Sequence, residues 1–202
     1  MLDRVALRLL HPAMAALAQR LVAAGVGANT VTVAGFALGG TSALAIATGS
    51  PLLGLMLLLA SRLCDGLDGA VARLTQPTDA GAFLDITLDF LFYASIPLAF
   101  AVVEPAANAL PAAVLLAAFI GTGSSFLAFA ALAQKRGLSS AAFPNKGLYY
   151  LGGLTEATET IGCFALMCLW PQHFALWAYG FAVLCTLTTA TRVWAGWSAL
   201  RG

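Results

Sequence analysis

Long apolar stretches, separated by short polar breaks, run along most of the chain. Six of them are close to the ~20 residues that a helix needs to cross a bilayer, and Gly, Pro and polar residues mark the breaks between them. We place the six predicted spans at about 30–49, 52–75, 80–103, 108–133, 147–170 and 174–197. The pattern predicts an all-α, polytopic integral membrane protein with six transmembrane helices, in a single domain over residues 1–202.

The first residues of the chain follow a different pattern. Over residues 2–24, apolar side chains such as Leu9 alternate with Arg4, Arg8 and Arg20. This arrangement predicts an amphipathic helix that lies in the membrane interface. The alternative is a short helix packed against its own protein. The segment lacks a short apolar core followed by a cleavage site, so we expect no signal peptide.

Composition supports the assignment to the membrane. Hydrophobic residues make up 60% of the chain and charged residues 9%, whereas an ordinary soluble domain has about 25% charged residues. So few charges could not cover the surface of a soluble fold. The formal net charge is +1, so no strong positive field attracts nucleic acid, and we expect no nucleic-acid partner.

The ten Lys and Arg residues predict the orientation in the membrane. With six spans, all ten lie on the side that holds both termini and the loops after the second and fourth spans, or in the adjoining half-helices. The opposite loops, near residues 50, 105 and 172, contain none. Because cytoplasmic loops carry the excess of positive charge, we expect both termini and the active site to face the cytoplasm, at a bacterial inner membrane.

Four aspartates lie near the cytoplasmic ends of the second and third predicted spans, where charged residues are costly and usually functional. Asp65 and Asp68 are three residues apart and Asp85 and Asp89 are four apart, so each pair shares one helix face. The short connection over residues 74–80 makes the two helices antiparallel neighbours. We therefore expect the four carboxylates to face one another across a cavity.

Carboxylates at close range repel one another unless they are protonated or neutralised by cations. Ligands that are all oxygen suit Mg²⁺, Mn²⁺ or Ca²⁺, and two divalent ions would balance four negative charges. Such ions stabilise the charge that develops in phosphoryl or phosphatidyl transfer, and a remaining acid can act as general base for an alcohol. The alternative is a structural ion-pair network with Arg62 and Arg73, and we expect Arg62 to be a salt-bridge partner of Asp65.

The acidic segment reads Asp65-x2-Asp68-Gly69-x2-Ala72-Arg73-x7-Gly81-x3-Asp85-x3-Asp89. It closely resembles the signature of the CDP-alcohol phosphotransferase (phosphatidyltransferase) family, with one residue fewer in the loop that follows the arginine. Members of this family are integral membrane enzymes, typically of six spans, that make phospholipids. They transfer a substituted phosphate from a CDP-linked donor to an alcohol and release CMP.

The resemblance assigns roles to the matching positions. Asp65, Asp68 and Asp85 would be metal ligands, and Asp89 would act as general base or complete a second metal site. The cofactor would be Mg²⁺ or Mn²⁺, as two ions. The other signature residues would line the CDP moiety, with the arginine near its phosphates: Gly69, Ala72, Arg73 and Gly81.

The stretch from Gly27 to Thr32 is similar to the Pro-Asn-x-x-Thr start of the first span in this family, with Ala28 in place of the proline. The resemblance implies that Asn29 and Thr32 contact the nucleotide. The alternative for Asn29 is a helix N-cap, a position that asparagine favours.

Two groups outside the signature are candidates for binding the acceptor alcohol. An acidic pair, Glu156 and Glu159, would line the acceptor pocket or bind a cationic headgroup or an ion, and its alternative role is to pair with Arg192. A basic group would bind an acceptor that carries a phosphate, or would set topology and contact anionic lipids: Lys135, Arg136, Lys146 and Arg192. Both an acidic and a basic acceptor site remain open.

Together these features predict a transferase that moves a phosphatidyl group from CDP-diacylglycerol to a small alcohol, among membrane lipids. The acceptor hydroxyl would lose its proton to Asp89 and attack the donor's β-phosphorus, and CMP would leave. The alternatives are a transferase for CDP-choline or CDP-ethanolamine, a cation-coupled transporter and a catalytically silent scaffold. Relatives are commonly homodimers, and a small-residue face at Gly35, Gly39 and Gly40 would permit close contact between two copies.

Overall fold

Helices account for nearly all of the described chain. The computed structural model describes residues 2–137 and 153–201, with side chains from residue 12 onward. These ranges contain no strand, so the predicted all-α class is confirmed. The helices are α1 (Leu2–Ala23), α2 (Ala28–Ala47), α3 (Pro51–Leu74), α4 (Asp79–Val103), α5 (Pro105–Lys135), α6 (Ala157–Leu169), the short 3-10 helix η1 (Pro171–His173) and α7 (Phe174–Leu200).

Local sequence explains where several helices begin. Pro51 and Pro105 occupy the first turns of α3 and α5, where the missing N–H has no partner to lose. The Thr78 hydroxyl caps α4 by accepting a hydrogen bond from the Gly81 N–H at 3.1 Å. Gly49 follows α2 with a φ of +83°, a conformation that glycine adopts without strain. The breaks therefore fall where turn-forming residues predict them.

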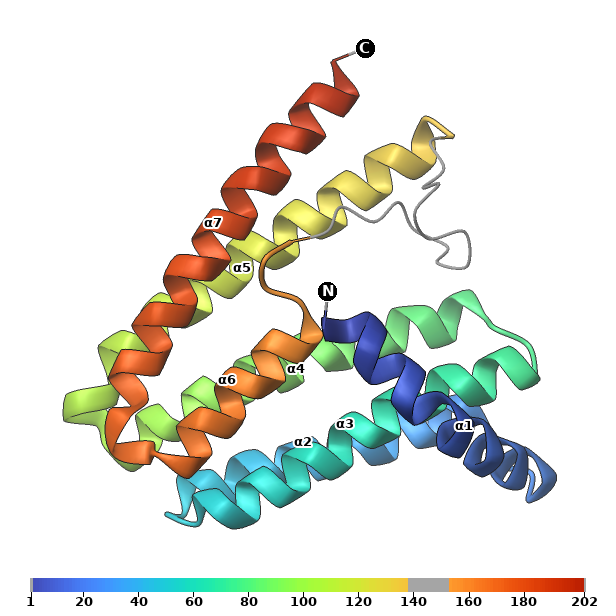
Figure 1. The fold of residues 1–202 in the computed structure, drawn as a ribbon, viewed down its shortest axis with the longest axis horizontal. Coiled ribbons are helices and arrows are strands. Elements are labelled where there is room, and N and C mark those ends of the chain that lie inside the picture. The colour runs from blue at the N-terminus through green and yellow to red at the C-terminus, as the bar shows by residue number, and fades with distance from the viewer. Residues whose placement is uncertain (1, 138–152, 202) are drawn as a thin grey trace.

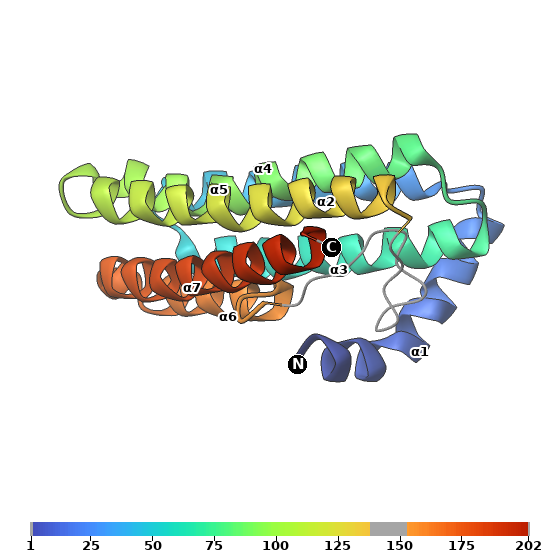
Figure 2. The same ribbon diagram turned by 90° about the horizontal axis from the view of Figure 1, so that it is seen from above.

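The helices form two layers, which Figures 1 and 2 show from two directions. α2, α4 and α5 lie in one layer, and α3, α6 and α7 lie in the other. Across the layers α2 packs against α3 and α5 packs against α7, while within its own layer α4 packs against both α2 and α5. α2 is therefore in contact with both helices that carry the predicted metal ligands.

Small residues on α2 allow this close packing. The Ser61 hydroxyl of α3 donates a hydrogen bond to the Gly35 carbonyl oxygen at 2.7 Å. A Cβ atom at Gly39 would lie 2.5 Å from Cδ2 of Phe92 on α4. Gly35 and Gly39 thus pack within the chain, which corrects the prediction that their face serves contact between two copies. Only the Gly40 part of that predicted face has open space around it among the described residues.

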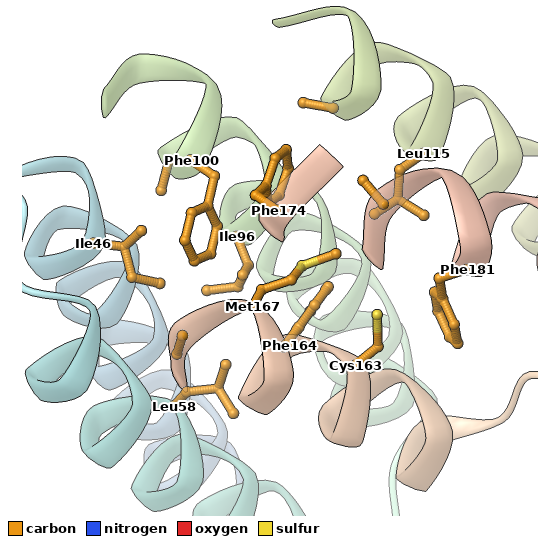
Figure 3. Close-up of a cluster of buried hydrophobic side chains, with 14 of the residues drawn as sticks. Ile46, Leu58, Ile96, Phe100, Leu115, Cys163, Phe164, Met167, Phe174 and Phe181 are labelled. Atoms are coloured by element: carbon orange, nitrogen blue, oxygen red, sulfur yellow. The ribbon is translucent and has the colours of Figure 1, made fainter. Parts of the chain in front are cut away.

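Aromatic and sulfur-containing side chains fill the core between α4, α6 and α7. Phe164 and Met167 of α6 are fully buried, and Figure 3 shows them beside Ile96, Phe100 and Phe174. The rings of Phe100 and Phe174 stack with their centroids 4.8 Å apart, an arrangement that stabilises aromatic pairs beyond simple burial. This core joins α6 and the start of α7 to α4.

Among the described residues, four helical segments are long and apolar enough to cross a membrane: Ala28–Ala47, Asp79–Val103, Pro105–Lys135 and Pro171–Leu200. Large apolar side chains such as Met56, Ile120 and Trp194 are exposed on the outside of the bundle, which is the surface expected of a protein in lipid. α3 has 24 residues, a sufficient length, but its second half carries several charged side chains. The structure therefore shows a membrane protein with four candidate spans.

α6 is shorter than predicted. It has 13 residues, or roughly 20 Å of helix, against a hydrocarbon core of about 30 Å. The predicted span at 147–170 is wrong over residues 153–156, which are not helical, and residues 147–152 lie outside the described ranges. The helix starts late because Glu156 and Glu159 form a capping box at its first turn.

α1 packs against α3 at one end of the bundle, where Figure 1 shows the two helices crossing. Ala18 of α1 is fully buried and belongs to a small apolar cluster with Val31, Leu67 and Val71. The predicted N-terminal helix is therefore present. It packs on its own chain, which is the alternative to a helix that contacts only the membrane interface. Its position in the membrane interface stays a prediction.

Candidate active site

The four predicted aspartates lie around one pocket between α2, α3 and α4. The residues that line it are Thr32, Gly35, Phe36, Ser61, Arg62, Asp65, Asp68, Asp85, Leu88 and Asp89. α3 contributes one acidic pair and α4 the other, while α2 closes the space between them with small and apolar residues. The four aspartates therefore line one pocket, as the sequence spacing predicts.

Asp68 is the most enclosed of the four acids, with 5% of its surface exposed. The Thr32 hydroxyl of α2 donates a hydrogen bond to Asp68 Oδ2 at 2.6 Å, and it also lies 3.1 Å from the Ala28 carbonyl oxygen. A short hydrogen bond to an ionised carboxylate is among the stronger ones in proteins. Thr32, which the sequence places near the nucleotide, thus orients a predicted metal ligand.

Arg62 lies among the acids. Its Nη1 is 2.6 Å from Asp89 Oδ1 and 3.3 Å from Asp65 Oδ1. The predicted salt bridge to Asp65 is confirmed, and the shorter contact to Asp89 is new. Sequence reasoning missed this contact because Asp89 lies on another helix, 27 positions away.

A divalent cation fits the chemistry of this pocket. Its acidic donors are all carboxylate oxygens, which Mg²⁺ and Mn²⁺ prefer. Four ionised carboxylates against the single charge of Arg62 leave three negative charges uncompensated. No three His, Cys, Asp or Glu side chains in the described ranges surround a common point closely enough to hold a metal ion. The donor set thus suits a cation, while in this structure two of the acids, Asp65 and Asp89, are paired with Arg62.

The residues predicted to contact CDP lie near the pocket rather than in its lining, apart from Thr32. Asn29 is exposed in the first turn of α2, and a Cβ atom at Gly81 would lie 2.9 Å from its Oδ1. A Cβ atom at Gly69 would lie 3.3 Å from Nη1 of the exposed Arg73. Ala72 is half-buried in the same turn of α3. These residues gather where α2 begins, α3 ends and α4 begins.

The N-cap interpretation of Asn29 is wrong. The N-cap of α2 is Gly27, and Asn29 is the second residue of the helix proper. Its side chain is therefore not needed to cap α2 and points toward the start of α4, where it approaches Gly81.

The basic acceptor candidates lie on α5 and α7, away from the lining of the carboxylate pocket. Lys135 and Arg136 are exposed at the end of α5. Arg192 of α7 is 9% exposed and donates a hydrogen bond from Nη1 to the Thr122 carbonyl oxygen of α5 at 3.2 Å. Lys146 lies outside the described residues. Figure 1 shows the ends of α5 and α7 on the same side of the molecule as the α3–α4 connection.

Glu156 and Glu159 have a local structural role that the sequence analysis did not consider. The Glu159 carboxylate accepts a hydrogen bond from the Glu156 N–H at 3.1 Å, and the Glu156 side chain accepts one from the Glu159 N–H. Both side chains are half-buried. The spacing of two glutamates three positions apart is the signal that could have predicted this helix start.

The comparison with known proteins agrees with this geometry. The sequence model of the CDP-alcohol phosphatidyltransferase family matches residues 26–195, a range that includes all four aspartates. The chain belongs to the CDP-alcohol phosphatidyltransferase family. The resemblance that the acidic signature indicates is therefore confirmed over most of the chain, and with it a membrane transferase of phospholipid biosynthesis.

Two curated relatives bear on this family assignment. Inner membrane protein YnjF of Escherichia coli is 49% identical over 205 residues, which cover 100% of this chain and 98% of the relative. An archaetidylinositol phosphate synthase of Methanothermobacter thermautotrophicus is 46% identical over 65 residues, which are 32% of this chain and 33% of the relative.

Solved structures of one family member have the same fold. Phosphatidylinositol phosphate synthase (PgsA1) of Mycobacterium tuberculosis, in complex with manganese and citrate, matches with a TM-score of 0.71 and 21% identity, over 91% of this chain and 88% of that one. The same enzyme with CDP-DAG bound matches with a TM-score of 0.65 and 22% identity, over 91% and 93% of the two chains.

Proposed function

We propose that this family member transfers the phosphatidyl group of CDP-diacylglycerol to a small alcohol and releases CMP. The observation that carries the proposal is the pocket of α2, α3 and α4, in which two acidic pairs from two helices meet. The PgsA1 structures, which contain manganese in one case and CDP-DAG in another, support it by their similar fold.

Asp65, Asp68, Asp85 and Asp89 would hold Mg²⁺ or Mn²⁺, as two ions. Divalent ions at this position supply electrostatic stabilisation to the phosphate oxygens as negative charge develops on them. Thr32 keeps Asp68 in one orientation through its 2.6 Å hydrogen bond. Thr32, Gly35 and Phe36 of α2 form the wall of the pocket beside the acids.

Asp89 would accept the proton of the acceptor hydroxyl as that oxygen forms a bond to the β-phosphorus of the donor. The bond from this phosphorus to the bridging pyrophosphate oxygen breaks, and its electron pair leaves with CMP. Asp89 lines the pocket from α4, and it matches the last acid of the family signature, which the resemblance assigns to this role.

The CDP moiety would bind at the junction where α2 begins, α3 ends and α4 begins. Six residues would contribute to this site, with the arginine near the phosphates: Asn29, Thr32, Gly69, Ala72, Arg73 and Gly81. The two glycines support this placement, because a Cβ atom at either position would approach a polar side chain at 3.3 Å or less. Their absent side chains keep Asn29 and Arg73 accessible to a ligand.

The acceptor would bind between the carboxylate pocket and the ends of α5 and α7. Lys135, Arg136, Lys146 and Arg192 are the candidates for an acceptor that carries a phosphate, and Glu156 and Glu159 for one that carries a positive charge. The capping box already uses both glutamates locally, whereas Lys135 and Arg136 are exposed. This difference favours the basic residues and an anionic acceptor.

For the whole chain we propose a single membrane domain of six spans: the four candidate spans, α3, and a sixth segment that includes α6, whose 13 helical residues alone are shorter than the hydrocarbon core. The charged half of α3 is compatible with a span because its acids line a cavity. Both termini and the pocket would face the cytoplasm of a bacterial inner membrane. The name of the Escherichia coli relative supports the inner membrane, and the distribution of Lys and Arg supports the orientation. A homodimer stays a prediction.

The test is CMP release by the purified protein in detergent with CDP-diacylglycerol and Mg²⁺ or Mn²⁺. Acceptors are offered one at a time: glycerol 3-phosphate, inositol phosphate, inositol, serine and choline. We expect metal-dependent release with one of them, and a loss of about 100-fold or more in Asp89→Asn, because that is the usual contribution of a general base. The exposed Glu104 provides a matched control, since Glu104→Gln removes the same charge at the junction of α4 and α5, away from the pocket and the proposed CDP site.

Each outcome of this assay has a distinct meaning. Release that is equal in Asp89→Asn and wild type would remove Asp89 from the mechanism. Binding of CDP without release from CDP-diacylglycerol would point to CDP-choline or CDP-ethanolamine as donor. A chain that neither binds CDP nor responds to metal would contradict the enzymatic function.

A further inference from the structure

The guanidinium of Arg62 joins the two halves of the carboxylate cluster. It contacts one acid from each helix, Asp65 of α3 at 3.3 Å and Asp89 of α4 at 2.6 Å. Its side chain is only 9% exposed. A guanidinium has donors and no acceptor, so it bonds to the same kind of oxygen atoms that a metal ion needs and cannot itself bind that ion.

The surroundings hold this guanidinium in place from its other side. Its Cζ lies 3.8 Å from the ring centroid of Phe92, a distance at which a cation and an aromatic face attract each other. The ring of Phe92 is 1% exposed and packs against Gly39 of α2. Nη2 also donates a hydrogen bond to the Ser61 hydroxyl at 3.2 Å. Phe92 and Ser61 therefore hold the guanidinium of Arg62 beside the acids.

One donor of this group is not used. Nε of Arg62 is buried and has no hydrogen-bond partner among the described residues. A buried donor without a partner is unfavourable. The surroundings of Arg62 therefore leave one of its hydrogen-bond donors unpaired, which a purely structural ion pair would not do. Arg62 thus forms strong ion pairs with the two carboxylates, while its Nε lacks a partner. This combination suits a residue that another cation can replace at the carboxylates.

We propose that Arg62 is the resident counter-ion of Asp65 and Asp89 and competes with the divalent cation for them. The inference rests on the proposed metal centre and adds a positioning residue to it. Without the cation, Arg62 keeps the two helices together against the repulsion of their acids. When the cation binds, the guanidinium releases at least Asp89, so part of the binding free energy is spent on displacing it. Arg62 thus sets the metal affinity of the site.

The experiment measures Mn²⁺ binding to the purified full-length chain in detergent, without donor or acceptor, by electron paramagnetic resonance. The variants are Arg62→Gln, Arg62→Lys and, as a matched control, Arg201→Gln at the exposed C-terminal end of α7. A nearby cation weakens proton binding to a carboxylate by roughly tenfold or more. It should weaken the binding of a divalent ion to the same carboxylate at least as strongly. We therefore expect Arg62→Gln to bind Mn²⁺ at least about tenfold more tightly than wild type, and Arg201→Gln to bind as wild type does.

Thermal melting separates competition from a merely structural role. In EDTA, we expect the melting temperature of Arg62→Gln to be lower than that of wild type. When Mn²⁺ is added, we expect the melting temperature of Arg62→Gln to rise by more than that of wild type. A structural ion pair would instead lower both melting temperatures equally and leave the Mn²⁺ affinity unchanged, and that result would overturn the inference. If Arg62→Gln does not fold, Arg62→Lys decides. It keeps the charge but loses the Nη2 contact to the Ser61 hydroxyl and the planar group over Phe92, so the cation is held less firmly. Tighter Mn²⁺ binding by this variant supports competition, and unchanged binding refutes it.

The same titration separates this inference from the proposed function. Wild-type protein that binds no Mn²⁺ would contradict the metal centre itself. Wild-type protein that binds Mn²⁺, together with an Arg62→Gln variant that binds it no more tightly, would contradict only the role of Arg62.

Discussion

At the scale of single residues, the four aspartates have unequal surroundings. Asp68 is held by a hydroxyl group of α2, whereas Asp65 and Asp89 share the guanidinium of Arg62. A hydroxyl that donates to a carboxylate fixes its orientation without adding charge, whereas a guanidinium also offsets its charge. The members of the cluster therefore differ in how tightly the protein holds them before any ligand arrives.

The contact between Thr32 and Asp68 gives a prediction for stability. Thr32→Val keeps the shape of the side chain and removes the hydroxyl donor from the buried carboxylate of Asp68, whereas Thr32→Ser keeps this donor. We expect Thr32→Val to lower the free energy of unfolding by about 1.5–3 kcal/mol in EDTA, the usual range for a hydrogen bond to a charged group. The comparison is made by denaturant or thermal unfolding in detergent. Equal stability of the valine and serine variants would show that the hydrogen bond contributes nothing.

Much of the site could be predicted at this scale. The spacing of the acids located all four, and the Asn-x-x-Thr pattern located Thr32. What could not be predicted is which atoms the side chains contact. Arg62 lies one turn from Asp65 and so was an expected partner, but its shorter contact to Asp89 depends on how α3 and α4 are placed in space.

At the scale of elements, α2 determines the shape of the site although it carries none of the acids. Gly35 and Gly39 bring it close to α3 and α4, and Thr32 and Phe36 form part of the pocket wall. Small residues at helix contacts permit such close approach in membrane proteins.

Two neighbouring glycines of α2 test this packing. Gly39→Ala places a methyl group 2.5 Å from the ring of Phe92, and overpacking of this kind costs about 1–3 kcal/mol. Gly40→Ala introduces the same atom into open space and is expected to be neutral, or stabilising by up to about 1 kcal/mol through helix propensity. Melting temperatures of the two variants would be compared in one detergent. Equal values would contradict the role assigned to Gly39.

For helices that begin at turn-forming residues, the predicted bounds were close. The span predicted at 52–75 is α3, Pro51–Leu74, and the span predicted at 108–133 is α5, which begins three residues earlier at Pro105. The start of α6 was not, because the apolar residues before Glu156 extend the hydropathy of the span in the N-terminal direction. Hydropathy alone does not distinguish a helix from a non-helical apolar segment, and here the capping box decides where the helix begins.

At the scale of the whole molecule, composition was sufficient to identify a membrane protein, and the comparison with the family confirms it. The arrangement of the helices was not predictable in the same way. The hydrophobic periodicity and the length of a segment predict a helix. Which helices contact one another depends instead on shape complementarity between surfaces that are far apart in the sequence. The placement of α2, α4 and α5 in one layer and α3, α6 and α7 in the other is such a feature.

The orientation in the membrane gives a prediction at this scale. Because the cations lie on one predicted side, a fluorescent protein fused after Gly202 should fluoresce, and alkaline phosphatase fused there should be inactive. The same two reporters fused after Ser50, in an opposite loop, should give the reverse pattern. Active alkaline phosphatase at the C-terminus would contradict the cytoplasmic placement of both the termini and the pocket.

The position of α2 between the acid-bearing helices also limits how this protein can be engineered. Along its inner face, Thr32, Gly35 and Phe36 both pack in the bundle and line the pocket, so selection for heat resistance at these positions would alter turnover at the same time. Gly40, Gly162 and Gly180 have open space around them within the described chain. Substitutions that aim at a more heat-stable variant with unchanged catalysis should begin at those outward positions and leave the inner face of α2 unchanged.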